Sequence, residues 1–308
     1  MRPRLLVLYY TQTGQLRQIL DSIISGIADK ADIDYAAIEP VKPFPFPWTP
    51  LQFFDVMPET VEHLPEPVKP LPTDILNKDY DLIIFGYQPW FLNPSQPITA
   101  FLQSDYAQVF KDKPVVTVIG SRNMWLHAQE MVKGYLQSVN AHLVGNIVLT
   151  DTNPNLVSLL TVIRWSFKGQ KQASGMLPAA GVQDKDIYEA YRFGNTIYKH
   201  FLGNNLTDLQ RELLAQGAVR LKPGLVILEQ RGIKNFRFWA KFIRKKGGPG
   251  DPNRAKRVLL FKNLLLVMVF ILSPLSSFTA RIMQLIKRRT LLKDVDYFKQ
   301  LGYEKGRI

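Results

Sequence analysis

Short, continuously apolar segments alternate with segments of helical spacing along residues 4–203. The apolar segments lack the hydrophobic–polar alternation of a half-exposed strand, so they predict strands that are buried on both faces. Parallel strands that are joined by helices form a sheet with helices on both sides. The predicted strands cover residues 4–10, 33–38, 80–87, 114–120 and 142–150, and the predicted helices cover 15–28, 97–104, 124–139 and 184–201. The sequence therefore predicts a doubly wound α/β fold with a parallel five-stranded sheet.

Two segments do not fit this alternation. Ten prolines lie between Pro40 and Pro72, and proline fixes φ and removes a hydrogen-bond donor, so neither a regular helix nor a central strand is expected there. The aromatic residues among these prolines favour an ordered excursion over a flexible linker. Residues 156–168 are apolar and aromatic and have no obvious place in the alternation. The predicted organisation is a domain over 1–203 with an insertion over 39–73, a connecting region over 204–253 and a basic, hydrophobic helical tail over 254–308.

The positive charge of the chain is concentrated near its end. The net charge is +13, and residues 241–308 hold 16 Lys and Arg against 4 Asp and Glu, a net of +12. Residues 1–240 are almost neutral, which argues against a uniformly basic nucleic-acid-binding protein.

The 308 residues include no cysteine, which excludes disulfides, thiolate metal sites and a cysteine nucleophile. Only six apolar or aromatic residues follow Arg4, too few for a signal peptide, so export is not expected.

Three loops follow the carboxyl ends of the predicted strands, where open α/β sheets bind their ligands: residues 11–16, 87–96 and 120–126. The first joins a strand to a helix and offers two hydroxyls, an amide and the N–H groups of a helix N-terminus, which suit a phosphate. It contains one glycine and no lysine or arginine, so it resembles neither a nucleotide-triphosphate loop nor a dinucleotide-binding turn. Simple capping of the helix by Thr is the alternative. The candidate phosphate ligands are Thr11, Gln12, Thr13, Gly14, Gln15 and Leu16.

The second and third loops carry aromatic, amide and cationic side chains. Aromatic rings at the mouth of a sheet can stack on a flat heterocycle, although they can equally pack beneath the proline-rich insertion. The candidates in the second loop are Gln88, Pro89, Trp90, Phe91 and Leu92, and those in the third are Ser121, Arg122, Asn123, Met124 and Trp125. Arg122 is either a charge beside the ligand or a solvated arginine at a helix start.

These loops resemble those of the flavodoxin-like superfamily, which implies FMN as cofactor. Its phosphate would lie on residues 11–16, and its ring between residues 88–92 and 121–125. A narrower resemblance is to the bacterial dialkylresorcinol condensing enzyme family of aryl-polyene and flexirubin-type pigment biosynthesis. The strings that carry it are Tyr-Tyr-Thr-Gln-Thr-Gly-Gln-Leu (9–16), Pro-Phe-Pro-Phe-Pro-Trp (43–48), Gly-Tyr-Gln-Pro-Trp-Phe-Leu-Asn-Pro-Ser (86–95), Ser-Arg-Asn-Met-Trp (121–125) and Leu-Val-Gly-Asn-Ile-Val-Leu (143–149).

The narrower resemblance implies an aromatase that oxidises a dialkyl cyclohexane-1,3-dione to a dialkylresorcinol beside a ketosynthase of the same pathway. The absence of cysteine agrees with this division, because a ketosynthase needs a thiolate. Arg122 is the candidate for stabilising flavin or enolate charge, and His127 and Tyr87 are the candidates for proton transfer. No spacing of His, Asp and Glu indicates a metal site. Two alternatives remain, an NAD(P)H-dependent quinone reductase and a membrane-tethered electron carrier or binding module.

The C-terminal region combines an apolar run with basic flanks. Residues 264–280 are apolar to weakly polar, a length at the short limit for a bilayer span, with basic clusters on both sides. This pattern favours helices that lie on an anionic membrane surface, and an ordinary buried helix pair is the alternative. The expected location is the cytoplasm, at the inner membrane. The expected partners are a lipophilic cyclic dione or quinone-like molecule, a ketosynthase, anionic lipid and a second copy of the chain, with no nucleic acid.

Overall fold

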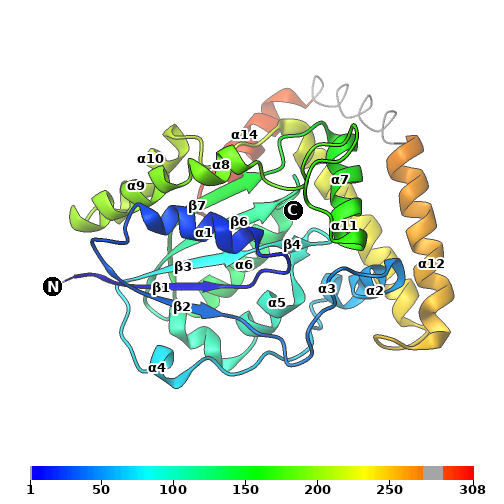
Figure 1. Ribbon diagram of the computed structural model, residues 1–308, viewed down its shortest axis with the longest axis horizontal. Coiled ribbons are helices and arrows are strands. Elements are labelled where there is room, and N and C mark those ends of the chain that lie inside the picture. Colours follow the sequence, from blue (N-terminus) through cyan, green and yellow to red (C-terminus); the bar gives the residue numbers. More distant parts are fainter. Residues whose placement is uncertain (1, 273–286) are drawn as a thin grey trace.

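A parallel five-stranded sheet forms the centre of the computed structural model, which describes residues 2–272 and 287–308. Its strand order is β2-β1-β3-β6-β7, and every neighbouring pair is parallel (Figure 1). The order reverses between β1 and β3, as it does in flavodoxin-like folds, so the predicted fold class is confirmed. The strands are β1 (Arg4–Tyr9), β2 (Asp32–Ala37), β3 (Leu82–Tyr87), β6 (Pro114–Ser121) and β7 (His142–Thr150).

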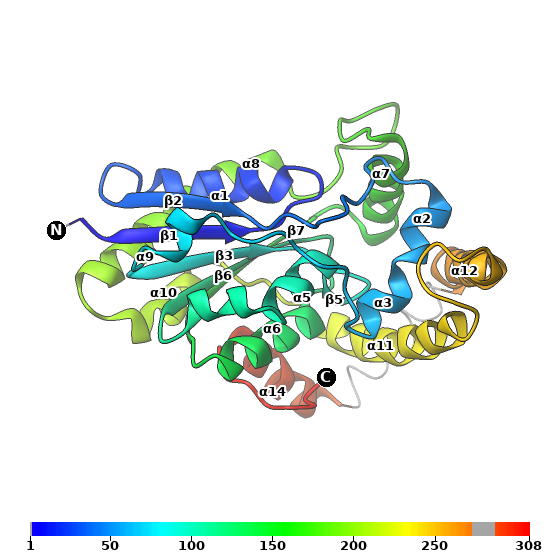
Figure 2. The ribbon, with the colours of Figure 1, turned by 90° about the horizontal axis from the view of Figure 1, so that it is seen from below.

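Two hydrophobic cores cover the two faces of the sheet, because alternate residues of each strand point to opposite sides. In β1, Leu6 and Leu8 join one core while Leu5 and Val7 join the other. One face carries α1 (Gln15–Ser25), α8 (Asp184–Tyr188), α9 (Tyr191–Leu202), η2 (Leu206–Asp208) and α10 (Leu209–Ala215). The opposite face carries α4 (Thr73–Leu76), α5 (Gln96–Leu102), η1 (Asp105–Phe110), α6 (Leu126–Ser138) and α14 (Arg288–Lys299) (Figure 2).

Helices α1 and α9 pack at unusually close range. A Cβ on Gly194 would lie 1.8 Å from the Ile23 carbonyl oxygen, and one on Gly26 would lie 2.4 Å from the Tyr191 oxygen. Only glycine permits this approach. The predicted single helix over 184–201 is also wrong in detail, because it is broken into α8 and α9 near Glu189.

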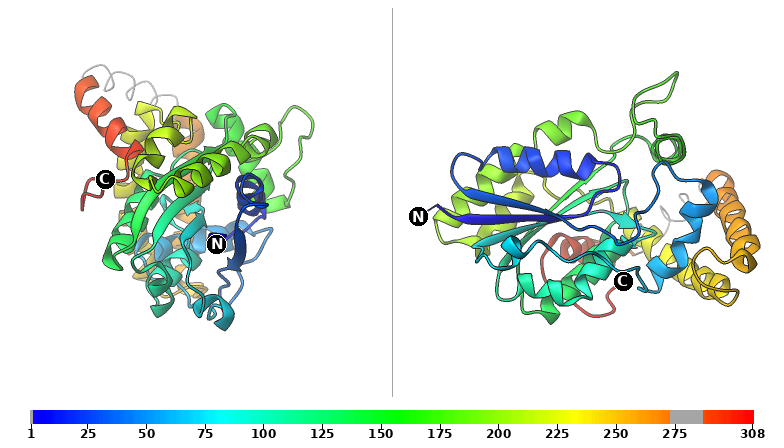
Figure 3. Two further views of the ribbon diagram at one scale, coloured as in Figure 1. Left: turned by 90° about the vertical axis from the view of Figure 1, so that its left-hand side faces the viewer. Right: turned by 60° about the horizontal axis from the view of Figure 1, so that its bottom comes forward.

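The segments that the alternation did not explain are ordered helices beyond the carboxyl ends of the strands. In the insertion, α2 (Pro50–Asp55) and α3 (Met57–Val61) both have proline in their first turn, where the missing N–H has no intrahelical partner. The expectation of an ordered excursion is confirmed, but the exclusion of helix from it is wrong. Residues 156–168 belong to α7 (Asn155–Lys168). Helix α3 packs against α11 (Pro223–Arg244) and α2 packs against α12 (Pro252–Val267) at one end of the molecule (Figure 3).

The later part of the chain packs on the same sheet. Val226 and Ile227 of α11 and Leu291, Val295 and Phe298 of α14 belong to the core that α5 and α6 also cover. Helix α12 continues into a π-helical turn, η3 (Met268–Leu272). Residues 273–280 of the predicted apolar run lie outside the described residues. Within the ranges that are described, no helix has both the length and the apolar character needed to cross a membrane.

Candidate functional site

The first and second predicted loops meet at the carboxyl edge of the sheet, because β1 and β3 are neighbours. With its amide oriented to suit its surroundings, the Gln88 side-chain oxygen accepts from the Gln12 N–H and from Trp90 Nε1, each at 3.2 Å. The third loop follows β6, the next strand, and its Ser121 and Arg122 carbonyls accept from the Asp151 N–H at 3.2 and 3.1 Å. The topology thus places the three loops along one edge at the switch point.

The loop before α1 presents an open helix N-terminus. Its last residue, Gly14, has φ +82°, and a Cβ there would meet nothing within 4 Å. The Gly14 N–H donates to Thr11 Oγ1 at 3.1 Å. Thr11 thus binds the N–H of the residue before α1, and within the described part of the chain no hydrogen bond joins a side chain to the N–H groups of the first turn of α1. The free N–H groups, together with the Thr11 and Thr13 hydroxyls, can bind an anion.

Two residues of this loop are committed to the core instead. Gln15 is 9% exposed, and its amide exchanges two hydrogen bonds with the Val182 backbone, at 3.0 and 2.9 Å. Leu16, in the first turn of α1, is buried in the core between that helix and the sheet. Only their backbone N–H groups are therefore available to a ligand. The Gln12 side chain accepts from the Tyr10 hydroxyl and donates to the Pro45 carbonyl at 3.0 Å, which ties the loop to the insertion.

An aromatic hairpin forms the second loop. Strands β4 (Pro89–Trp90) and β5 (Asn93–Pro94) are joined by Phe91 and Leu92, which have φ of +47° and +69°. Trp90 makes edge contacts with Tyr10, Phe44 and Trp48, at centroid distances of 5.9, 5.0 and 5.8 Å. Packing beneath the insertion, one of the two alternatives for this ring, is thus what the structure shows. Leu92 is buried at 8% exposure.

The third loop is fastened to α7. Arg122 Nη1 and Asn123 Nδ2 both donate to Asn155 Oδ1, at 2.9 and 3.0 Å. Ser121 Oγ donates to the Met124 carbonyl at 3.2 Å, which closes the turn. Trp125 is 1% exposed in the core, so the structure does not bring its ring to the site. Arg122 is held by protein groups and is not a freely solvated arginine.

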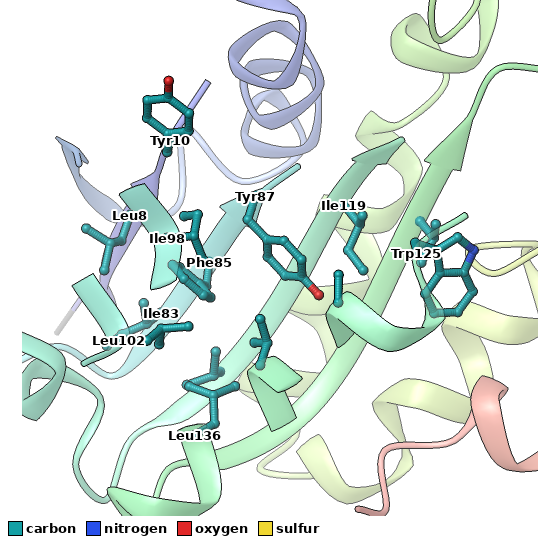
Figure 4. Close-up of a cluster of buried hydrophobic side chains, with 14 of the residues drawn as sticks. Leu8, Tyr10, Ile83, Phe85, Tyr87, Ile98, Leu102, Ile119, Trp125 and Leu136 are labelled. Atoms are coloured by element: carbon teal, nitrogen blue, oxygen red, sulfur yellow. The ribbon is translucent and has the colours of Figure 1, made fainter. Parts of the chain in front are cut away.

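Tyr87 also lies in the core. Its side chain points to the same face as Phe85, away from the loops, and its hydroxyl donates to Gln129 Oε1 (Figure 4). Gln129 Nε2 in turn donates to Thr117 Oγ1 at 3.2 Å. Complete burial raises the pKa of Tyr87 well above its usual value. This environment argues against proton transfer by Tyr87.

His127 is buried at the start of α6. Arg237 Nη2 lies 3.3 Å from its Nε2, and its Nδ1 lies 3.3 Å from the Leu92 carbonyl oxygen. A cationic neighbour requires Nε2 to accept, so Nδ1 carries the proton and donates to Leu92. Burial, Arg237 and His63 lower the pKa of His127 to about 4. Both nitrogens of a neutral ring are occupied, which argues against its assignment as a catalytic base.

Glu229 of α11 is a residue that sequence reasoning missed. It is fully buried, and its Oε1 accepts from the His127 N–H at 2.8 Å, so it caps α6 from a distance of 102 residues in the chain. Burial raises its pKa to about 7. The sequence feature that could have drawn attention to Glu229 is its position as the single acidic residue of the otherwise apolar stretch 225–229. Asn155, which holds the third loop, gave no comparable signal.

The cavity that the structure shows lies apart from these loops, and the described residues form no metal site at them. The described residues contain no group of three or more His, Asp and Glu arranged to hold a metal ion. A shallow cavity of about 780 Å³ lies elsewhere, between α1 and α8, where Ser22, Lys171 and Tyr188 line it. The candidate site is the edge of the sheet where the N-terminus of α1 lies beside the hairpin that carries Trp90.

Comparison with known proteins gives similarity in fold. No protein-family model matches the chain, and no curated protein matches its sequence. A flavoprotein from Lactobacillus acidophilus NCFM, solved in complex with FMN, is 17% identical, covers 48% of this chain and 93% of its own, and has a TM-score of 0.37. A flavodoxin from the domain Archaea is 13% identical, covers 65% of this chain and 99% of its own, and has a TM-score of 0.36. A WrbA-like flavodoxin from Agrobacterium tumefaciens is 12% identical, covers 65% of this chain and 98% of its own, and has a TM-score of 0.32. At these values the fold assignment rests on the strand order of the chain itself.

Proposed function

We propose that the protein is an FMN-dependent oxidoreductase that acts on a lipophilic cyclic dione. The observation that carries this proposal is the open N-terminus of α1, which follows Thr11 and Thr13. It lies at the switch point of the parallel sheet, whose strand order is β2-β1-β3-β6-β7. An N-terminus of this kind binds a phosphate through its N–H groups and dipole. The sequence resemblance described above supports FMN as the molecule that supplies the phosphate.

The residues present fit the cofactor in two respects. Space is open around Gly14, so a phosphate can approach the backbone without steric conflict. The Asn155 side-chain oxygen accepts from both Arg122 and Asn123, so it holds the guanidinium and the amide at the loop beside which we expect the ring. When bound, FMN supplies the acceptor for a hydride. Arg122 is the residue that we expect to stabilise negative charge on the ring or on an enolate.

The aromatic surroundings support a lipophilic substrate. Beyond the hairpin, Phe91 contacts Phe53 and Phe236, with ring centroids 5.1 and 5.9 Å apart. This aromatic cluster continues into α12 through Phe261. Alkyl chains on a ring substrate would find apolar contacts there. Oxidation of a dialkyl cyclohexane-1,3-dione to a dialkylresorcinol removes one hydride and one proton, and the acidity of the dione reduces the need for a strong base.

Replacing Thr13 with Val tests the phosphate site. Thr13→Val removes a hydroxyl and keeps the shape, so we expect FMN affinity to fall about 10- to 100-fold, the effect of losing a hydrogen bond to a charged group. Fluorescence titration of the apoprotein measures this change. Thr73→Val, at the exposed start of α4, is the matched control and should leave affinity unchanged. Equal affinity in both variants, or absence of flavin binding by the wild type, would refute the proposal.

Anaerobic mixing with a dialkyl cyclohexane-1,3-dione tests the reaction. We expect the flavin absorbance to bleach as about one equivalent of resorcinol appears per flavin, because hydride and proton leave the ring together. Rapid bleaching by NAD(P)H alone, with no reaction of the dione, would identify a quinone-reductase type of enzyme instead. Failure of both reagents with bound flavin would favour an electron carrier. Mass spectrometry of the product is the measurement.

A further inference from the structure

Helix α12 exposes an apolar face at the outer edge of the molecule. Its opposite face is buried through Val258 and Phe261, which pack on the aromatic cluster. The side chains of the exposed face are between 36% and 46% accessible, and they are Leu259, Leu260, Leu264 and Val267 of α12 with Met268 and Phe270 of the η3 turn that continues it. α12 forms one end of the molecule in the views of Figures 1 and 2, so this face looks away from the sheet. Contiguous exposed apolar side chains on this scale mark a surface that meets another apolar phase.

A cationic stripe on α11 lies beside this face. Lys234, Phe238, Lys241 and Lys245 are all exposed and recur at intervals of four, three and four residues, which places them along one side of a helix. Phe238 is 64% exposed. Arg257 connects the two helices: it donates to the Phe242 carbonyl and its guanidinium lies 4.0 Å from the Phe242 ring centroid. The apolar face and the stripe are therefore neighbours.

We propose that these two helices dock on the surface of an anionic membrane, with the α12 face in the lipid and the α11 lysines at the headgroups. An apolar helix face bordered by lysine and an aromatic residue is the pattern of interfacial helices. The three lysines of the stripe add attraction for anionic headgroups. Lys256 extends the positive charge onto α12 itself. This complementarity favours lipid over a second copy of the chain, whose own lysines would face those of the first.

Docking in this orientation would place the aromatic cluster behind α12 next to the lipid. The buried side of α12 contacts the aromatic cluster through Phe261, and that cluster reaches the hairpin through Phe236 and Phe91. The aromatic cluster would then lie between the bilayer and the hairpin, where the alkyl chains of a dialkyl substrate would find apolar contacts. This last step rests on the proposed function, whereas membrane docking does not.

Vesicle sedimentation with the full-length protein tests the stripe. We expect binding to phosphatidylcholine vesicles that contain about 30% phosphatidylglycerol and weak binding to phosphatidylcholine alone. The triple variant Lys234→Gln, Lys241→Gln, Lys245→Gln should lower the partition coefficient about 100-fold, at about fivefold for each charge. Lys42→Gln, Lys111→Gln, Lys305→Gln removes the same charge from exposed positions elsewhere and should bind as the wild type does. Equal losses in the two triple variants would overturn the proposal.

A second variant tests the apolar face and leaves the charge intact. Leu260→Ser, Leu264→Ser, Met268→Ser changes exposed side chains, so the fold is expected to persist by circular dichroism. We expect the partition coefficient to fall about fivefold for each side chain, because less apolar area enters the lipid. Light scattering gives the oligomeric state of both proteins. A wild-type dimer that the triple-serine variant dissociates, without any change in vesicle binding, would show that the face covers a second copy. FMN binding should be unaffected, so failure here is separable from failure of the proposed function.

Discussion

Arg254→Leu should lower the free energy of unfolding by about 3–5 kcal/mol, the usual cost of leaving buried charges without their partner. Arg254 is 0% exposed at the start of α12. Its Nε lies 2.7 Å from Asp55 Oδ1 and its Nη1 lies 2.8 Å from Glu59 Oε1, so it joins α12 to both helices of the insertion. The substitution leaves these two carboxylates facing each other with much of their compensation removed. Urea denaturation monitored by circular dichroism measures the loss.

Two comparisons separate this effect from a general loss of charge. Lys69→Gln breaks the ion pair between Lys69 and Glu39, whose side chains are 54% and 61% exposed, and should cost less than about 1 kcal/mol. Adding Asp55→Asn and Glu59→Gln to Arg254→Leu should recover a large part of the lost stability, because the two carboxylates that Arg254 compensated are then neutral, and only the longer pair between Arg244 and Glu59, at 3.5 Å, is lost in addition. A loss for Arg254→Leu no larger than that for Lys69→Gln would contradict the burial argument.

Most of the sheet was predictable because β1, β3 and β6 are buried on both faces and therefore leave continuous apolar runs, whereas the edge strand β2 is only partly buried. β1 and β3 have this form, and their observed bounds differ from the predicted ones by at most two residues. The helices α2 and α3 were not predictable in the same way. Their prolines stand in first turns, and a count of prolines does not show which turn each one occupies.

The position of the candidate site also followed from topology, but the orientation of its side chains did not follow from loop membership. Ile83, Phe85 and Tyr87 alternate onto one face, so the strand period itself directs Tyr87 to the core. Applying that period would have removed Tyr87 from the candidates for proton transfer. His127 is different, because its burial depends on Arg237 and Glu229 of α11, and contacts across 102 and more residues leave no local pattern.

The titrations of Glu229 and His127 make the free energy of unfolding depend on pH in opposite directions. The pKa of Glu229 is raised from 4.5 to about 7, so between these values the folded state holds a proton that the unfolded state has lost, and stability falls as pH rises. The pKa of His127 is lowered from 6.5 to about 4, so between these values the unfolded state holds the extra proton, and stability rises with pH. Each shift corresponds to about 3 kcal/mol. Between about pH 4.5 and 6.5 the two contributions largely cancel.

Glu229→Gln should expose the His127 contribution. The glutamine amide oxygen can still accept from the His127 N–H. Because an amide does not titrate, the contribution of Glu229 to stability, which falls as pH rises, disappears. We expect the stability of the variant to rise by about 3 kcal/mol between about pH 4 and 6.5, and the gap between variant and wild type to widen by a similar amount up to about pH 7. Urea denaturation at a series of pH values measures both profiles. Glu39→Gln, at an exposed ion pair, should reproduce the wild-type profile. Parallel profiles for Glu229→Gln and the wild type would show that Glu229 is ionised in the folded protein throughout this range, with its charge stabilised by the N-terminus of α6.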